Sequence, residues 1–144
     1  MSEITKSVLS LKSLLTSAKT VEADYPGFPG FKLNLSFLSR EDLVKIRKKA
    51  TSTSYKKGSP VETLNDELFL QLYTQGSVKG WSGLKLEYVE KLAPVDLTGQ
   101  DLENTLEYSD ENALFLMKQS NDFDSFISET VTDLSNFPSA NGKK

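Results

Sequence analysis

The sequence contains no cysteine and no histidine. Their absence excludes disulfide bonds, thiol nucleophiles, zinc sites built on cysteine or histidine, Ser-His-Asp triads and imidazole acid–base catalysis within this chain. Carboxylates remain available, either as an acid–base pair or as oxygen ligands for Mg²⁺ or Ca²⁺. Because the commonest catalytic groups are missing, we expect a protein that is not an enzyme and that holds no cofactor or metal.

Long apolar runs are also missing. No stretch approaches the ~20 apolar residues that are needed to cross a bilayer, and lysines and serines interrupt the apolar residues among positions 1–17. We therefore expect neither a membrane anchor nor a secretory signal. The 144 residues, 38% of them hydrophobic and 26% charged, are otherwise typical of one globular domain.

Charge is unevenly distributed along the chain, although the formal net charge is only −3. Residues 40–58 contain seven basic and two acidic side chains, whereas residues 59–144 contain six basic and fifteen acidic ones. The basic stretch could contact phosphates, but the acidic remainder repels a polyanion, and within the basic stretch Tyr55 is the one aromatic residue that could stack on bases. We therefore expect no nucleic acid partner. Two interpretations stay open: a solvated helix face, or attraction between basic and acidic faces of neighbouring copies.

An apolar stripe runs through the N-terminal residues. It repeats every three or four positions and consists of Ile4, Val8, Leu11 and Leu15. This spacing predicts a helix over residues 4–18, although the many serines and threonines weaken helix propensity. The segment either packs as a helix or depends on a partner. We therefore treat residues 1–18 as a separate segment, with Leu11 and Leu15 as candidate partner-binding residues.

Residues 20–38 predict a β-hairpin. The sequence Pro26-Gly27-Phe28-Pro29-Gly30 is a turn signal between two extended stretches. In the second stretch apolar and polar residues alternate, and the apolar side consists of Phe31, Leu33, Leu35 and Phe37. Because two strands alone are marginally stable in water, this face must pack against helices or against another copy.

Helical patterns follow the hairpin. The first covers residues 40–50 and begins after Ser39 and Asp42, a pair typical of a capping box. Near its C-terminus, where cations are favoured, outward basic side chains form a candidate partner-binding site, Arg47, Lys48 and Lys49. The remaining expected segments are an exposed loop over 51–60, helices over 62–75, 109–119 and 122–137, and a stretch over 85–108 that no pattern assigns.

Together these patterns predict an α+β fold. We expect a mostly helical single domain of four or five helices with an N-terminal β-hairpin, formed by residues 19–137. The closing residues, 138–144, are expected to be disordered.

The single tryptophan lies in a glycine-rich stretch, residues 76–84. The spacing G-x-x-x-G-x-x-G differs from the dinucleotide-binding fingerprint, so phosphate binding is not expected. We predict instead that Gly80 and Gly83 permit a turn next to Trp81, and that these three residues have structural roles. The indole N–H should bond to a carbonyl, and the ring should cover an apolar helix face formed by Leu64, Leu68 and Leu72.

Short segments in a fixed order carry a resemblance to a known family. They are GFKL (30–33), LSREDLVKIRKK (38–49), ELF (67–69), VKGWSGL (78–84), EYSDENA (107–113), DFD (122–124) and DLSNF (133–137). In this order the chain resembles the tail assembly chaperones of long-tailed (siphovirus-type) bacteriophages. The likeness covers about residues 10–137.

The resemblance implies a non-enzymatic protein that is made in the host bacterial cytoplasm and is absent from the finished particle. Members of that family bind the long, largely helical tape measure protein, keep it soluble and help tail tube subunits to polymerise around it. Many have a longer form, made by ribosomal frameshifting, whose extension recruits the tail tube protein. The ending Gly142-Lys143-Lys144 is compatible with a slippery site for such a frameshift.

We expect self-association as well, with Arg47, Lys48 and Lys49 facing an acidic surface of a neighbouring copy. A structural tail-completion or head–tail joining protein that stays in the virion is the alternative function.

Overall fold

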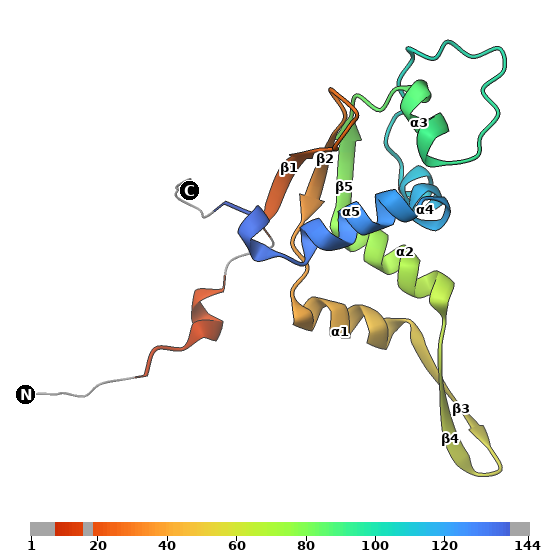
Figure 1. The fold of residues 1–144 in the computed structure, drawn as a ribbon. Helices are drawn as coiled ribbons and strands as arrows, with labels where there is room; N and C mark the ends of the chain where they lie inside the picture. Colours follow the sequence, from red (N-terminus) through yellow and green to blue (C-terminus); the bar gives the residue numbers. More distant parts are fainter. Residues whose placement is uncertain (1–7, 16–18, 139–144) are drawn as a thin grey trace, which may run out of the picture.

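The structure is a computed structural model that describes residues 8–15 and 19–138 (Figure 1). It has an α+β fold, as predicted: a small single domain in which helices cover one face of a sheet that begins with an N-terminal hairpin. The strands are β1 (Thr20–Asp24), β2 (Lys32–Ser36), β3 (Thr51–Lys56), β4 (Ser59–Leu64) and β5 (Val78–Ser82). The helices are α1 (Arg40–Lys49), α2 (Asp66–Ser77), α3 (Leu86–Leu92), α4 (Asp110–Gln119) and α5 (Asn121–Val131), with short 3₁₀ turns at Leu11–Leu14 and Leu134–Asn136.

The central sheet is antiparallel, with the strand order β1-β2-β5. The predicted hairpin forms β1 and β2, and its turn places Gly27 and Gly30 at positive φ. On the inner face of β2, Leu33 and Leu35 are fully buried, whereas Asn34 points outward and is exposed. From Lys32 to Leu35 the alternation in the sequence therefore gives one buried and one wetter face, as predicted, whereas Ser36 at the end of β2 is buried as well.

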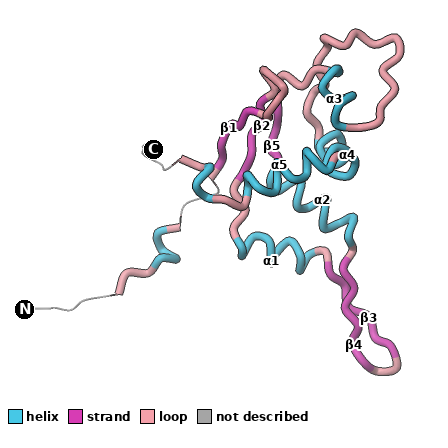
Figure 2. The backbone as a smooth tube through the Cα atoms, in the orientation of Figure 1, coloured by secondary structure: helices cyan, strands magenta, loops and turns pink. Residues whose placement is uncertain are grey.

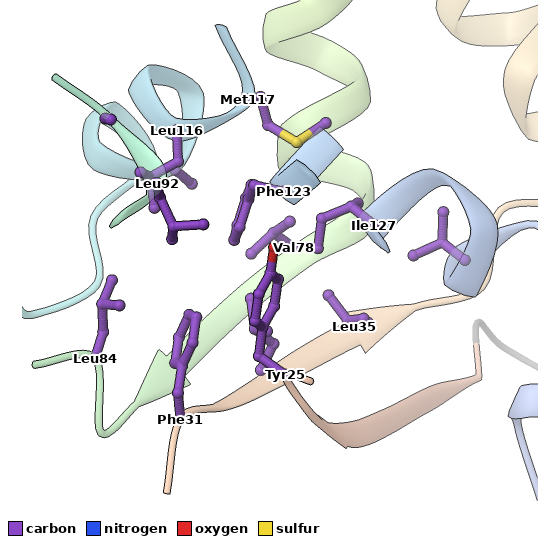
Figure 3. Close-up of a cluster of buried hydrophobic side chains, with 14 of the residues drawn as sticks. Tyr25, Phe31, Leu35, Val78, Leu84, Leu92, Leu116, Met117, Phe123 and Ile127 are labelled. Carbon is purple, nitrogen blue, oxygen red and sulfur yellow. The ribbon is translucent and has the colours of Figure 1, made fainter. Parts of the chain in front are cut away.

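Helices α2, α4 and α5 close the inner face of this sheet. Figure 3 shows Phe123 and Ile127 of α5 next to Leu35 and Val78 of the sheet, with Leu116 and Met117 of α4 behind them. A serine side chain caps the N-terminus of each of the two C-terminal helices. Ser109 accepts a hydrogen bond from the N–H of Asn112, and Ser120 accepts one from the N–H of Phe123. The predicted helix over 109–119 is confirmed, and the next helix ends at Val131 instead of 137.

Helix α1 begins with the predicted capping box. Ser39 Oγ accepts from the N–H of Asp42 at 3.1 Å, and Asp42 Oδ2 accepts from the N–H of Ser39 at 2.9 Å. These reciprocal bonds satisfy two backbone donors that have no partner inside the helix. Local sequence therefore fixes the start of α1 at Arg40.

The prediction of an exposed loop over 51–60 is wrong. Residues Thr51–Lys56 and Ser59–Leu64 pair in register as a two-stranded hairpin, with a tight turn in which Lys57 and Gly58 have positive φ. This β3–β4 hairpin is almost fully exposed and projects from the body of the protein beyond α1 and α2 (Figure 2). The hairpin also takes the first residues that were expected to be helical, so α2 begins at Asp66 behind the N-cap Asn65.

Residues 83–109 connect β5 to α4 through α3 and a long loop. Helix α3 is only seven residues long and buries Tyr88, Val89 and Leu92. An isolated bridge between Lys85 and Thr105 ties the loop back to the start of α3. No pattern assigned these residues beforehand, because their apolar positions follow neither the period of a strand nor that of a long helix.

Of the two alternatives for the N-terminal segment, the packed helix is wrong where the structure can test it, and dependence on a partner stays a prediction. Within residues 8–15 there is one 3₁₀ turn, Leu11–Leu14, and no buried residue. Ile4, the first residue of the stripe, lies outside the described residues, as does the expected disordered tail beyond Pro138. A short isolated helix is marginally stable in water unless its apolar face is buried, and residues 8–15 are all exposed.

Candidate functional site

The predicted basic residues lie together at the C-terminal end of α1, and all three side chains are exposed. They are not equivalent. The guanidinium of Arg47 lies 5.6 Å from the centre of the Phe69 ring, which ties this side chain to α2. Lys48 faces solvent, while Lys49 lies at the rim of a groove between the two helices.

This groove, which we call the α1–α2 groove, has a volume of about 290 Å³. Its floor is apolar and consists of Leu38, Ile46, Leu72 and Gly76. Its rim is charged and consists of Asp42, Lys45 and Lys49. An apolar floor with a net basic rim has the chemistry needed to hold the apolar face of an amphipathic helix with acidic neighbours. Lys45 was missed in the sequence because only the packing of α1 on α2 shows which face of α1 meets the groove.

The β3–β4 hairpin continues the chain directly between α1 and α2. At its base the N–H of Asn65 donates to the carbonyl of Ala50 at 2.8 Å, which closes the two ends of the hairpin. Tyr55 is 72% exposed, and Lys56 and Lys57 occupy the tip. An isolated two-stranded hairpin is marginally stable in water. Its strand edges are therefore available for pairing with an extended segment of another protein.

Leu11 and Leu15, the apolar candidates, are each 76% exposed. The structure does not bring them together with Arg47, Lys48 and Lys49. Figure 1 shows the N-terminal segment and the β3–β4 hairpin on opposite sides of α1. The two predicted partner-binding sites are thus separate surfaces.

A second groove, which we call the α5 groove, lies between the β1–β2 turn, α3 and α5 and has a volume of about 380 Å³. Three aromatic rings pack together in its floor: the ring centre of Tyr25 lies 5.1 Å from that of Phe28 and 4.8 Å from that of Phe126. Asp122, Ser125 and Glu129 of α5 form one rim, and Lys91 of α3 lies on the other. Sequence reasoning missed this groove because its residues come from three distant segments.

The pKa of Tyr25 reflects this setting. Burial of the hydroxyl raises the pKa to about 12, and the nearby Asp122 carboxylate acts in the same direction. Both causes disfavour a negative charge on the ring oxygen. Asp122 therefore adds a negative potential beside Tyr25.

Trp81 lies on β5 and packs edge-on against Phe31 and Tyr108, at 6.3 Å and 5.1 Å between ring centres. Its Nε1–H donates to the carbonyl of Leu106 at 2.9 Å, which agrees with the expected carbonyl acceptor. The expected surface is wrong, since the ring packs against Phe31 just before β2, Phe123 of α5 and Tyr108 of the loop before α4. We expected the ring on α2 because α2 lies just before Trp81 in the sequence. The position of Trp81 is instead set by the pairing of β5 with β2.

The two glycines beside Trp81 differ in role. Gly80 lies inside β5 opposite Asn34, so its expected place in a turn is wrong. Gly83 has φ of +74°, and a Cβ at this position would lie 2.0 Å from the carbonyl oxygen of Gly30. Only glycine fits there.

Among residues 8–15 and 19–138, no three acidic side chains come together closely enough to hold a metal ion. Over the same ranges, no helix has the length and apolar character required to span a membrane.

A family model described as YdaY prophage protein matches residues 38–143, a range that includes both helices of the α1–α2 groove and the whole of α5. No curated protein and no solved structure matches the chain.

Proposed function

The chain belongs to the YdaY prophage protein family, and we propose that this phage protein is a tail assembly chaperone. In this role it binds the tape measure protein, keeps it soluble and promotes assembly of the tail tube around it. It acts without catalysis in the host cytoplasm and is not retained in the virion. Two observations support this proposal. Short segments between residues 30 and 137 follow one another in the same order as in such chaperones, and the family is of phage origin.

The α1–α2 groove is the observation that carries the proposal. A chaperone of an elongated helical client needs an apolar surface that accepts one face of an amphipathic helix. Leu38, Ile46 and Leu72 offer such a surface beneath a rim that is net basic. In this proposal, apolar residues of a client helix enter the groove, and acidic residues beside them pair with Lys45 and Lys49.

The β3–β4 hairpin extends this binding surface beyond the groove. It begins directly after α1 and ends directly before α2, so it projects from the same side of the molecule (Figure 1). Its tip adds Lys56 and Lys57 to the basic residues of α1. We propose that the hairpin contacts the client alongside the groove, with Tyr55 as an exposed aromatic contact.

The tail tube protein is the second proposed partner, recruited through a longer form of the chain that is made by frameshifting after Gly142-Lys143-Lys144. Sequencing the coding region tests this part separately. A slippery heptamer near these codons and an open −1 frame downstream are expected. Without either one, recruitment through a frameshifted form is wrong.

Coexpression with the tape measure protein encoded by the same prophage tests the main proposal. The expected result is a soluble complex of the two proteins, and insoluble tape measure protein when this chain is omitted. Mass spectrometry of purified particles should then find the tape measure protein but not this chain. Equal solubility of the tape measure protein with and without the chain contradicts the chaperone role, and the chain's presence in particles favours a structural tail protein instead.

A further inference from the structure

We propose that residues 8–15 of one copy dock in the α5 groove of a second copy of this chain. The contact requires no client protein, so it goes beyond the proposed chaperone function and can be tested separately from it.

The N-terminal segment has the composition of a docking element. Five of its eight residues are large and apolar, and the most exposed are Val8 at 94% and Leu11 and Leu15 at 76% each. Lys12 is its one charged residue. A concentration of exposed apolar side chains of this kind is unusual in a monomer and marks an interaction site. In helical form, Val8, Leu11 and Leu15 would share one face, with Lys12 beside them.

The α5 groove has the matching shape and charge. Its floor is apolar and aromatic, with the rings of Phe28 and Phe126 packed on Tyr25. Its α5 rim is acidic through Asp122 and Glu129, which lie on the same side of the helix at a spacing of seven residues. Lys91 of α3 lies on the opposite rim, so the groove is net acidic and Lys12 is attracted to its α5 side. A segment that contains three leucine or valine anchors and a neighbouring lysine can place the anchors on the rings and the lysine against these carboxylates.

Two other apolar grooves fit this segment less well. The α1–α2 groove has Lys45 and Lys49 as well as Asp42 on its rim, and this net basic rim repels Lys12. A smaller groove of about 200 Å³ between α3, the following loop and α4 is lined by apolar residues and Asn112, and offers no carboxylate. Charge complementarity therefore selects the α5 groove.

The occupant is a second copy, because the segment leads away from its own groove. Lys19 is held in line with β1, since its carbonyl accepts from the N–H of Phe37 at 2.8 Å. The groove is built on Tyr25 and Phe28, at the opposite end of β1. Figure 1 shows residues 8–15 extended from the body, and their apolar side chains are exposed.

Sedimentation velocity of the full chain over a range of concentrations tests the proposal. The wild-type protein should exceed the 16.0 kDa of one copy as concentration rises. Two variants should each weaken association by at least about tenfold: L11D/L15D, which alters exposed residues of the segment, and S125R/E129K, which alters exposed residues of the groove rim. The matched control Q119R/E107K makes the same change in net charge at exposed positions outside the groove and should associate like wild type.

Mixing the two defective variants gives the decisive result. L11D/L15D has an intact groove and S125R/E129K has an intact segment, so together they should form a complex that neither forms alone. Three results would each overturn the proposal. The first is a wild-type chain that remains monomeric, as docking within one chain requires. The second is association that persists in S125R/E129K, as expected if the segment binds another surface, and the third is a mixture of the two variants that stays monomeric.

Discussion

Gly83 lies so close to Gly30 that a Cβ at Gly83 would approach the Gly30 carbonyl oxygen to 2.0 Å. This contact joins the turn between β1 and β2 to the segment that follows β5. Leu84, the next residue, is fully buried, and its carbonyl accepts from the N–H of Leu106. The contact therefore helps to place the loop that closes over Trp81.

We predict that Gly83→Ala destabilises the protein by about 2–4 kcal/mol, because the new Cβ meets backbone and the positive φ is strained for any other residue. Urea denaturation followed by tryptophan fluorescence measures the change. Gly76→Ala is the matched control: its Cβ would meet Leu38 at an ordinary 3.5 Å. This helical substitution should stabilise the protein by about 0.5–1 kcal/mol. A Gly83→Ala variant as stable as wild type contradicts the structure at this contact.

Trp81→Phe should cost about 1–3 kcal/mol, because the Leu106 carbonyl loses the indole N–H that bonds to it at 2.9 Å. The smaller ring also weakens the edge-on contacts with Phe31 and Tyr108. The chain has no other tryptophan, so circular dichroism in urea must follow unfolding of this variant. Unchanged stability would mean that Trp81 does not hold the loop in place.

Alkaline pH should destabilise the protein through Tyr25 and Tyr108. Burial raises the pKa of each from 10.0 to about 12, with smaller contributions from the Asp122 carboxylate at Tyr25 and the Asp110 hydrogen bond at Tyr108. The folded state thus retains these protons more tightly than the unfolded state. Their contribution to stability is full below pH 10 and is lost as pH rises from about 10 towards about 12.

The measurement is the urea midpoint as a function of pH, combined with the near-ultraviolet absorbance of tyrosinate. Tyr25→Phe and Tyr108→Phe should each reduce the loss of stability in this window, relative to wild type. Tyr55→Phe on the exposed hairpin serves as the control and should leave the curve unchanged. Curves for all three variants that superimpose on wild type would contradict the prediction.

Removal of the β3–β4 hairpin should leave the fold intact. The N–H of Asn65 already bonds to the Ala50 carbonyl, so a short glycine linker in place of residues 52–63 can connect α1 to α2. Because these residues bury almost no surface against the body, the melting temperature should change by less than about 3 °C. Loss of cooperative unfolding would show that the hairpin belongs to the core. Unchanged client binding would show that the hairpin does not contact the client.

Sequence reasoning succeeded where neighbours in the chain decide the structure. The alternation from Phe31 to Leu35 predicts β2, and the Ser39 and Asp42 pair predicts the start of α1. The β3–β4 hairpin was missed because its strands, rich in serine and threonine, contain no apolar alternation, and the short turn at Lys57 and Gly58 decides the pairing.

The candidate sites were predictable only in part. The basic end of α1 follows from one helix, but the grooves depend on contacts between distant segments. Helix α5 meets Tyr25 across nearly a hundred residues of chain, and no local pattern reports such a contact. Leu11 and Leu15 stood out as apolar residues at helical spacing, and the structure places them on an exposed segment.

The affinity of the purified chain for its tape measure protein tests the central claim most directly. We predict that K45E/K49E, which reverses charge at the rim of the α1–α2 groove, weakens binding at least about tenfold. K48E, one helix position away and outside the groove, should bind within about twofold of wild type. Binding that is equally strong in all three proteins, or absent in all three, would contradict the account.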